Sequence, residues 1–179
     1  MDKLKPLFFE QTLRHWHFED LLKASGMSRE RVHFYLKKLL QEDFVQRIKQ
    51  RGKMPYFLAQ HESPEFRLEK RIYGFQILQQ SGLFTHLFSM KNLKTAILFG
   101  SFARGDWGKS SDVDLFLYGD DKLFEKNVFE KKLKRPLQIF SFQQAKEAKK
   151  QLEPTLLENI AKGFNIKGSL EPFEVDIHA

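Results

Sequence analysis

Two aspartates at the start of an apolar strand constrain this chain more than any other feature. Residues 95–99 have the composition of a short buried strand, and Gly100-Ser101 follows them directly. Twelve residues after Gly100, Asp112-Val113-Asp114 leads into a second apolar strand over residues 113–118. Because side chains alternate along a strand, Asp112 and Asp114 lie on one side of it and Val113 on the other. The sequence therefore predicts a sheet with two neighbouring carboxylates on one strand.

This pair of carboxylates favours a divalent cation and a phosphate-bearing ligand. Two carboxylates side by side repel each other unless a cation lies between them, and oxygen ligands of this kind suit Mg²⁺. A glycine lets a ligand approach the backbone, and free N–H groups at the start of a helix attract phosphate. Gly100-Ser101 precedes such a short helical segment, Phe102-Ala-Arg.

The rest of the C-terminal part alternates between helix and strand. We expect helices over residues 121–134, 143–150 and 154–162, and strands over residues 137–142 and 164–167. Strands and helices in one mixed sheet are typical of an α/β or α+β domain.

The first sixty residues have a different organisation. A short amphipathic helix over residues 17–26 ends at Gly26, and Ser28 is a good N-cap for the next helix. That helix carries apolar residues at i, i+3, i+4, i+7 and i+8, which are Val32, Tyr35, Leu36, Leu39 and Leu40. Two β-prone runs, 44–48 and 55–59, flank a glycine-containing basic tip and predict a hairpin. A helix-turn-helix followed by a hairpin is a winged helix.

The overall expectation is an α+β protein with an N-terminal winged helix and a C-terminal α/β domain with a mixed sheet. The predicted divisions are a winged helix-turn-helix domain over residues 1–61, a helical connector over residues 62–93 and the α/β domain over residues 94–179. The connector is expected to be helical over residues 63–90 with an interruption at Ser81-Gly82.

Most of the excess positive charge lies in the N-terminal part. The net charge is +7, and residues 1–60 hold 12 Lys and Arg against 7 Asp and Glu. This distribution favours a local basic patch that contacts a phosphate backbone. The candidate DNA-binding residues are Arg29, Arg31, His33, Lys37, Lys38, Arg47, Lys49, Arg51 and Lys53. The last four recur at spacing two and would share one face if the strand continues. A structural or dimerising module is the alternative.

The aspartate stretch resembles the signature of a known enzyme superfamily. Gly100-Ser101, ten intervening residues and Asp112-x-Asp114 resemble the motif of DNA polymerase β-like nucleotidyltransferases. The fuller string Gly-Ser-Phe-Ala-Arg-Gly…Ser-Asp-Val-Asp is similar to the minimal nucleotidyltransferase branch, and the resemblance covers about residues 94–168. It implies that Gly100 and Ser101 hold the β- and γ-phosphates of a nucleotide. It also implies that Asp112 and Asp114 are catalytic and bind Mg²⁺, with Mn²⁺ as a substitute.

The resemblance has one departure. The family takes a third carboxylate from a later strand, and the matching position here is Gln138. A neutral amide can donate or accept a hydrogen bond but supplies neither the charge nor the basicity of a carboxylate. A second, catalytic metal ion therefore becomes doubtful. Substitutes for the missing acid would be Glu130, Glu174 or Asp176.

Several other patterns carry less weight. Arg104 and Lys109 flank the motif and would neutralise a triphosphate, although solvation at the surface is an equal alternative. Residues 103–110 resemble a loose phosphate loop, but a strand follows the Lys-Ser pair where such a loop opens a helix. Trp107 would either stack on a base or pack in the protein. His15 and His17 lie two residues apart with no third metal ligand in the sequence nearby.

The function expected from these observations is Mg²⁺-dependent transfer of a nucleoside monophosphate from an NTP to a hydroxyl, coupled to a DNA-binding winged helix. The alternatives are a DNA-binding regulator with a degenerate, nucleotide-sensing transferase domain, and an antitoxin-like protein that covers another chain. The expected partners are a nucleoside triphosphate and double-stranded DNA, and a homodimer remains open. The chain has no cysteine and no apolar run of about 18 residues, so we expect a cytoplasmic protein without a membrane partner.

Overall fold

The computed structural model describes residues 3–169, apart from the side chains of residues 145 and 149. The chain divides into two compact units. The N-terminal unit contains residues 1–70 and 107–109, and the C-terminal unit contains residues 71–106 and 110–179. The three-part division expected from the sequence stays a prediction, and the two units are described separately below.

Helices α1 (Lys5–Glu10), α2 (Phe18–Ser25) and α3 (Arg29–Gln41) begin the N-terminal unit. Gly26 has a φ of 63° and ends α2 in the left-handed conformation that glycine adopts without strain. The Ser28 hydroxyl accepts the backbone N–H of Arg31 at 3.4 Å and so caps α3 as predicted. Val32, Leu36 and Leu39 are buried, which confirms that the apolar stripe of α3 faces the interior.

Strands β1 (Val45–Ile48) and β2 (Tyr56–Ala59) form the expected antiparallel hairpin. Their register runs from Val45 opposite Ala59 to Ile48 opposite Tyr56. β1 ends at Ile48. The alternation of side chains along a strand, which was expected to extend through Lys53, therefore stops there. Lys49, Arg51 and Lys53 lie in the exposed connecting loop, where no strand geometry aligns their side chains.

Aromatic side chains fill the core of the N-terminal unit. The ring of Phe9 meets Phe44 at 5.5 Å and Phe66 at 5.3 Å, both edge-on. Edge-to-face contacts of this kind add to the stabilisation from burial alone. Trp107 is fully buried in the same core, with its ring centroid 6.5 Å from that of Phe9.

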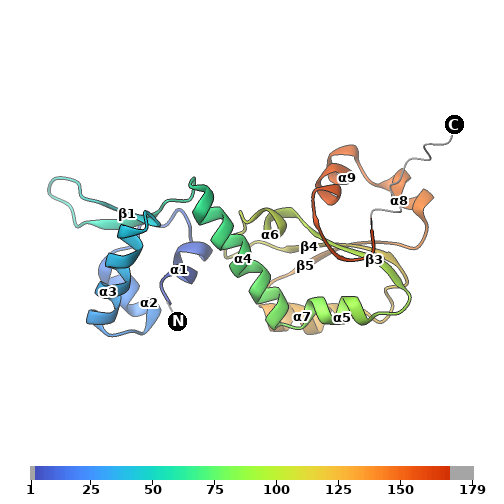
Figure 1. Cartoon of the computed structure of the whole chain (residues 1–179), viewed down its shortest axis with the longest axis horizontal. Coiled ribbons are helices and arrows are strands. Elements are labelled where there is room, and N and C mark those ends of the chain that lie inside the picture. The colour runs from blue at the N-terminus through green and yellow to red at the C-terminus, as the bar shows by residue number, and fades with distance from the viewer. Residues whose placement is uncertain (1–2, 170–179) are drawn as a thin grey trace. The chain divides into compact units, whose positions relative to one another are not determined.

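The C-terminal unit is built on a four-stranded sheet (Figure 1). Its strands are β3 (Leu93–Phe99), β4 (Val113–Gly119), β5 (Leu137–Phe142) and β6 (Phe164–Lys167), in the order β5-β4-β3-β6. β4 and β5 are parallel, whereas β3 is antiparallel to both β4 and β6. The sheet is therefore mixed, as the sequence predicts.

In the described part of the chain six helices accompany these strands, and α4 extends from the N-terminal unit into the C-terminal unit. They are α4 (Pro64–Gln80), α5 (Leu83–Ser89), α6 (Gly100–Arg104), α7 (Lys126–Leu133), α8 (Ala145–Gln151) and α9 (Pro154–Ala161). Figure 1 shows α5 and α7 on one side of the sheet and α9 on the other. The break between α4 and α5 falls at Ser81-Gly82 as expected.

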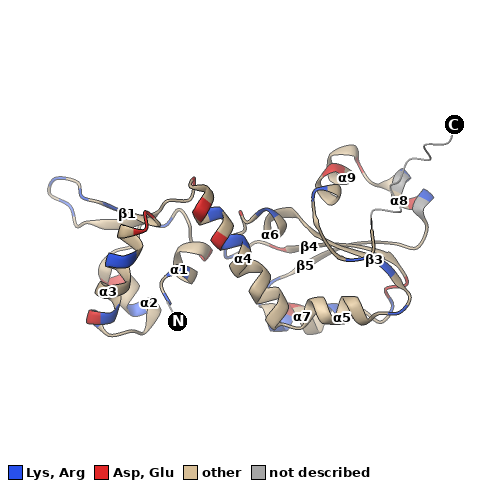
Figure 2. Ribbon diagram, viewed as in Figure 1, with Lys and Arg blue, Asp and Glu red and all other residues tan. Residues whose placement is uncertain are grey.

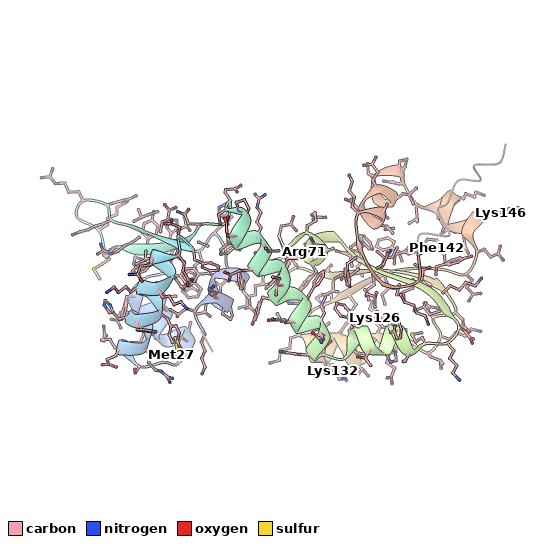
Figure 3. All side chains as sticks on the ribbon, viewed as in Figure 1. Met27, Arg71, Lys126, Lys132, Phe142 and Lys146 are labelled. Atoms are coloured by element: carbon pink, nitrogen blue, oxygen red, sulfur yellow. The ribbon has the colours of Figure 1, made fainter. Side chains whose placement is uncertain are left out.

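One buried cluster joins the sheet to α8 and α9. It consists of Ile97, Phe99, Phe116, Phe142, Ala148, Leu152 and Ile160. Phe142, at the end of β5, is labelled beside the helical segment that carries Lys146 (Figure 3). Phe116 and Phe142 stack at 6.1 Å within this cluster. On β4 the alternating Val113, Leu115 and Leu117 are also buried, so both faces of this strand are covered.

The expected helix over residues 121–134 begins later than predicted. Residues 121–125 form a turn instead, in which the N–H of Phe124 donates to the carbonyl of Asp121 at 2.8 Å. The Asp120 carboxylate accepts the N–H of Lys122 at 3.1 Å, because a short acidic side chain competes with helix formation at this point. Within residues 3–169, no helix combines the length and the apolar character needed to cross a membrane.

Candidate active site

Strand register brings the predicted site residues to one edge of the sheet. Phe99, the last residue of β3, lies opposite Asp114 of the antiparallel strand β4. Gln138 of the parallel strand β5 lies opposite Asp114 on the other side. The site is therefore formed where β3 ends and where β4 and β5 begin.

Gly100 is required by its contact with Asp114. It has a φ of 67°, which L side chains rarely adopt. A Cβ atom at this position would overlap the carboxylate of Asp114. The Asp114 side chain therefore lies against the backbone of the turn that opens α6.

The two aspartates repel each other electrostatically. Asp112 is exposed and Asp114 is half-buried. The pKa of Asp114 is raised from 3.8 to about 6, chiefly by burial and also by the negative charge of Asp112. The positive charge of Arg104 opposes both effects on this pKa. Two carboxylates that resist full ionisation together are a donor set that fits a divalent cation.

Gln138 occupies the position beside Asp114 where the sequence resemblance places a third acid. Residues opposite each other on neighbouring strands point to the same face of a sheet, so Gln138 and Asp114 share a face. Among residues 3–169, no group of three or more His, Cys, Asp and Glu side chains is placed to hold a metal ion. The described part of the site thus offers two carboxylates and one amide.

The predicted substitutes for a third acid lie elsewhere. Glu130 accepts the backbone N–H of Leu137 at 2.9 Å and lies 3.7 Å from the ammonium of Lys126. Its carboxylate therefore fixes the start of β5. Glu174 and Asp176 are outside the described residues.

Ser101 and Arg104 both belong to α6, the short helix that Gly100 opens. Ser101 is half-buried in the first turn, and Arg104 is exposed at the end. The Arg104 guanidinium donates to the Asp106 carboxylate at 3.0 Å. Because both side chains of this ion pair are more than half exposed, Arg104 keeps the freedom to turn toward an anionic ligand.

Lys109 and Trp107 belong to the N-terminal unit. The Lys109 backbone N–H donates to the carbonyl of Glu10 at 2.9 Å, and a nucleotide-binding role for its side chain stays a prediction. The Trp107 indole N–H donates to the carbonyl of Lys70 at 3.2 Å, and the ring is fully buried. Of the two roles considered for Trp107, packing is therefore correct and base stacking is wrong.

Sequence reasoning missed Arg135, which stabilises the segment before the aspartates. Its side chain is 8% exposed, and the guanidinium donates to the carbonyl of Ser111 at 3.3 Å. The residue directly precedes Pro136 and β5, but nothing in its sequence context distinguishes it from the neighbouring lysines. Only the tertiary structure shows that it lies beside the backbone that leads to Asp112.

Figure 2 shows Lys and Arg in blue on α3 and along the hairpin loop. The candidate DNA-binding residues there fall into two classes according to their ion pairs. Arg29 pairs with Glu19 at 2.8 Å, and Lys38 lies 3.6 Å from Glu42. The remaining candidates have no ion pair among the described residues, and they are Arg31, His33, Lys37, Arg47, Lys49, Arg51 and Lys53.

The two histidines considered as metal ligands have other contacts. His15 stacks on the ring of Tyr56 at 4.1 Å. The Nδ1 atom of His17 lies 2.9 Å from the carbonyl of Pro55, at the start of β2.

Comparison with known proteins identifies a family. The model of a family described as "Nucleotidyltransferase domain" matches residues 84–177, just over half of the chain. The matched region contains Gly100, both aspartates and Gln138. No curated protein matches the sequence.

Proposed function

Because this chain belongs to the nucleotidyltransferase domain family, we propose that it transfers a nucleoside monophosphate from an NTP to a hydroxyl acceptor. In this reaction the acceptor oxygen bonds to the α-phosphorus, the bond from that phosphorus to the bridging oxygen breaks, and pyrophosphate leaves. The observation that supports the proposal most strongly is the strand register that sets Asp114 against Gly100, together with the charge of Asp112 that acts on Asp114.

The proposed roles follow from the positions of the side chains. Asp112 and Asp114 would hold Mg²⁺ or Mn²⁺, and the metal when bound supplies charge neutralisation at the α-phosphate. Gly100 has no side chain, so a phosphate group can approach the backbone, and Ser101 can donate its hydroxyl in the same turn. Arg104 is proposed to neutralise the outer phosphates.

Gln138 limits what this site can do. In place of the expected acid it offers an amide, which accepts or donates a hydrogen bond but takes up no proton at neutral pH. The proposed reaction therefore uses a hydroxyl acceptor whose proton leaves without a carboxylate at this position. A site that binds nucleotide without transferring it is the alternative that Gln138 favours.

The test is transfer of α-labelled NTPs, one base at a time, with Mg²⁺ or Mn²⁺. The full chain is incubated alone and with cell lysate, beside Asp112→Asn and Asp114→Asn. The matched control is Asp121→Asn, which changes an acid at the other end of β4. Label that requires Asp112 and Asp114 but not Asp121 supports the proposal, and the labelled species names the acceptor. Metal-dependent nucleotide binding without any label would contradict the transfer and favour a sensor.

We also propose that the N-terminal unit is a winged helix that binds double-stranded DNA. The observation that favours this second function is the group of cations on α3 and the hairpin without ion pairs among the described residues (Figure 2). A duplex carries closely spaced phosphates, so each such cation that meets one releases a counterion.

Fluorescence anisotropy with a labelled duplex at several salt concentrations tests this function. Binding whose affinity falls steeply as salt rises supports it. Absent binding, or binding that salt does not change, would contradict it without affecting the transfer proposal.

A further inference from the structure

A pocket of about 450 Å³ opens within the N-terminal unit, between α2, α3 and the hairpin. Its apolar wall is formed by Phe18, Leu36, Leu40, Pro55 and Phe57. Leu36 and Phe57 belong to the packed core, whereas Phe18, Leu40 and Pro55 are half-buried and leave apolar surface open to the pocket. Small-molecule sites in proteins commonly enclose roughly 300 to 1,000 Å³. The pocket is therefore large enough for a small ligand.

Positive charge surrounds this apolar wall. Lys37 of α3 and Arg47 of β1 both line the pocket, and neither has an ion pair among residues 3–169. His33, one turn before Lys37, lines it as well. Among the described residues Glu19 is the one acid in the lining, and its carboxylate is held by Arg29 at 2.8 Å. The lining thus combines an apolar surface with two cations that form no ion pair with an acid of residues 3–169.

This combination selects against most simple ligands. An inorganic anion would pair with the cations but leave the apolar wall in water, whereas a hydrocarbon would cover the wall and leave the cations unpaired. A molecule with an apolar body and one anionic group satisfies both.

We propose that the pocket binds a small amphipathic anion, an aromatic or aliphatic carboxylate or sulfonate. Its body lies on Phe18, Leu40 and Pro55, and its anionic group pairs with Lys37 and Arg47. Because these two cations are also among those proposed to face DNA, a bound anion neutralises part of that surface. The pocket site does not depend on nucleotide transfer.

The test uses 1-anilinonaphthalene-8-sulfonate as the probe, titrated into the full chain and followed by fluorescence. Bound probe is then displaced with 1-naphthoate and with 1-naphthamide, which has the same ring system and no charge. We expect saturable binding at one site, with the carboxylate at least ~10-fold more effective than the amide. The backbone amide signals of Leu40 and Phe57 should shift in the NMR spectrum as 1-naphthoate is added.

Paired variants separate this site from general surface attraction. Lys37→Met with Arg47→Met should weaken probe binding at least ~10-fold. Lys38→Met removes a neighbouring charge of the same helix outside the pocket and should change the binding less than about twofold. Lys37 and Arg47 are both exposed, so their replacement leaves the packed core intact. Equal displacement by the amide, equal loss in the control, or unshifted Leu40 and Phe57 signals would each overturn the proposal.

Discussion

The two units of this chain each gather like charges, but they hold them in different ways. In the C-terminal unit, Asp114 is half-buried against the turn at Gly100, and strand register sets its position. In the N-terminal unit, Lys49, Arg51 and Lys53 project from an exposed loop. We expect the function of the aspartate site to depend on exact geometry, so that a displaced atom impairs it. We expect the loop cations to act through their number, so that a change in their positions matters less.

The largest effect is expected from adding one methyl group at Gly100, beside Asp114. Gly100→Ala places a Cβ atom against the Asp114 carboxylate and imposes a strained φ of 67°. Displacing a catalytic group by about 1 Å costs on the order of 100-fold in rate, so we expect at least that loss in label transfer.

Gly82→Ala is the matched control for this change. Gly82 has a φ of 83° in the same unit, but a Cβ atom there meets nothing within 4 Å. It should cost about 1 to 2 kcal/mol of stability from backbone strain and leave the transfer rate unchanged. Equal losses of transfer in the two variants would show that the contact with Asp114 is unimportant.

A smaller effect is expected when the loop charges of the N-terminal unit are removed. Changing Lys49, Arg51 and Lys53 to Ala together should reduce duplex affinity by roughly 10- to 100-fold and lower the salt slope by about 2.7, since each phosphate contact contributes about 0.9. Anisotropy titrations at several salt concentrations measure both quantities. Single changes should give about a third of the slope change, whichever lysine or arginine is chosen.

The control for the loop variant removes three exposed lysines from the C-terminal unit, which are Lys122, Lys131 and Lys146. It alters the net charge of the chain by the same amount. If the salt slope falls equally in both triple variants, the affinity for DNA depends on the total charge of the chain and the loop has no special role.

A gain of about tenfold in transfer rate is expected from restoring a third acid. Gln138→Glu places a carboxylate on the face of the sheet that Asp114 occupies. Steady-state transfer with Mg²⁺ measures the gain, and Gln138→Met serves as the uncharged variant of similar size. If Gln138→Glu is no faster than the wild type, the amide is not what limits the reaction.

The smallest expected effect concerns stability without metal. The pKa of Asp114 is raised from 3.8 to about 6, so the folded state binds this proton more tightly than the unfolded chain does. The stabilisation from the protonated form is fully present below pH 3.8 and is lost as pH rises through about 6.

Asp114→Asn should therefore stabilise the metal-free chain by about 1 kcal/mol at pH 8, after allowance for solvent screening of a half-buried group. Urea unfolding at pH 4 and pH 8 measures this difference. If the difference in unfolding free energy between Asp114→Asn and the wild type is the same at pH 4 and at pH 8, the raised pKa of Asp114 is contradicted.

Local patterns predicted much of the fold. The apolar stripe at Val32, Leu36 and Leu39, the cap at Ser28 and the interruption at Ser81-Gly82 are all short-range signals, and the structure contains each of them. The strand over residues 137–142 was predicted to the residue for the same reason. The start of α7 was predicted five residues too early, because the Asp120 turn competes with the helix through a single hydrogen bond.

The site was predictable where it depends on spacing along one strand, and not where it depends on contacts between distant segments. Alternation predicted Asp112 and Asp114 as neighbours, and the charge of Asp112 does act on Asp114, although β4 itself begins at Val113. Resemblance to the family identified Gln138 as the position of the missing acid. The close approach of Asp114 to Gly100, the Arg135 hydrogen bond to Ser111 and the burial of Trp107 all require the tertiary structure.

The central claim is that Asp112 and Asp114 hold a divalent cation for a nucleotide, and the titration of Asp114 tests it most directly. The ¹³C signal of its side-chain carboxyl would be followed by NMR from pH 3 to pH 9, with and without Mg²⁺ and a non-hydrolysable NTP. We expect a midpoint near pH 6 in the free protein, as the raised pKa requires. With metal and nucleotide the midpoint should fall below about 4, since a bound cation favours the ionised carboxylate. A midpoint that stays in place when both are added would contradict the account.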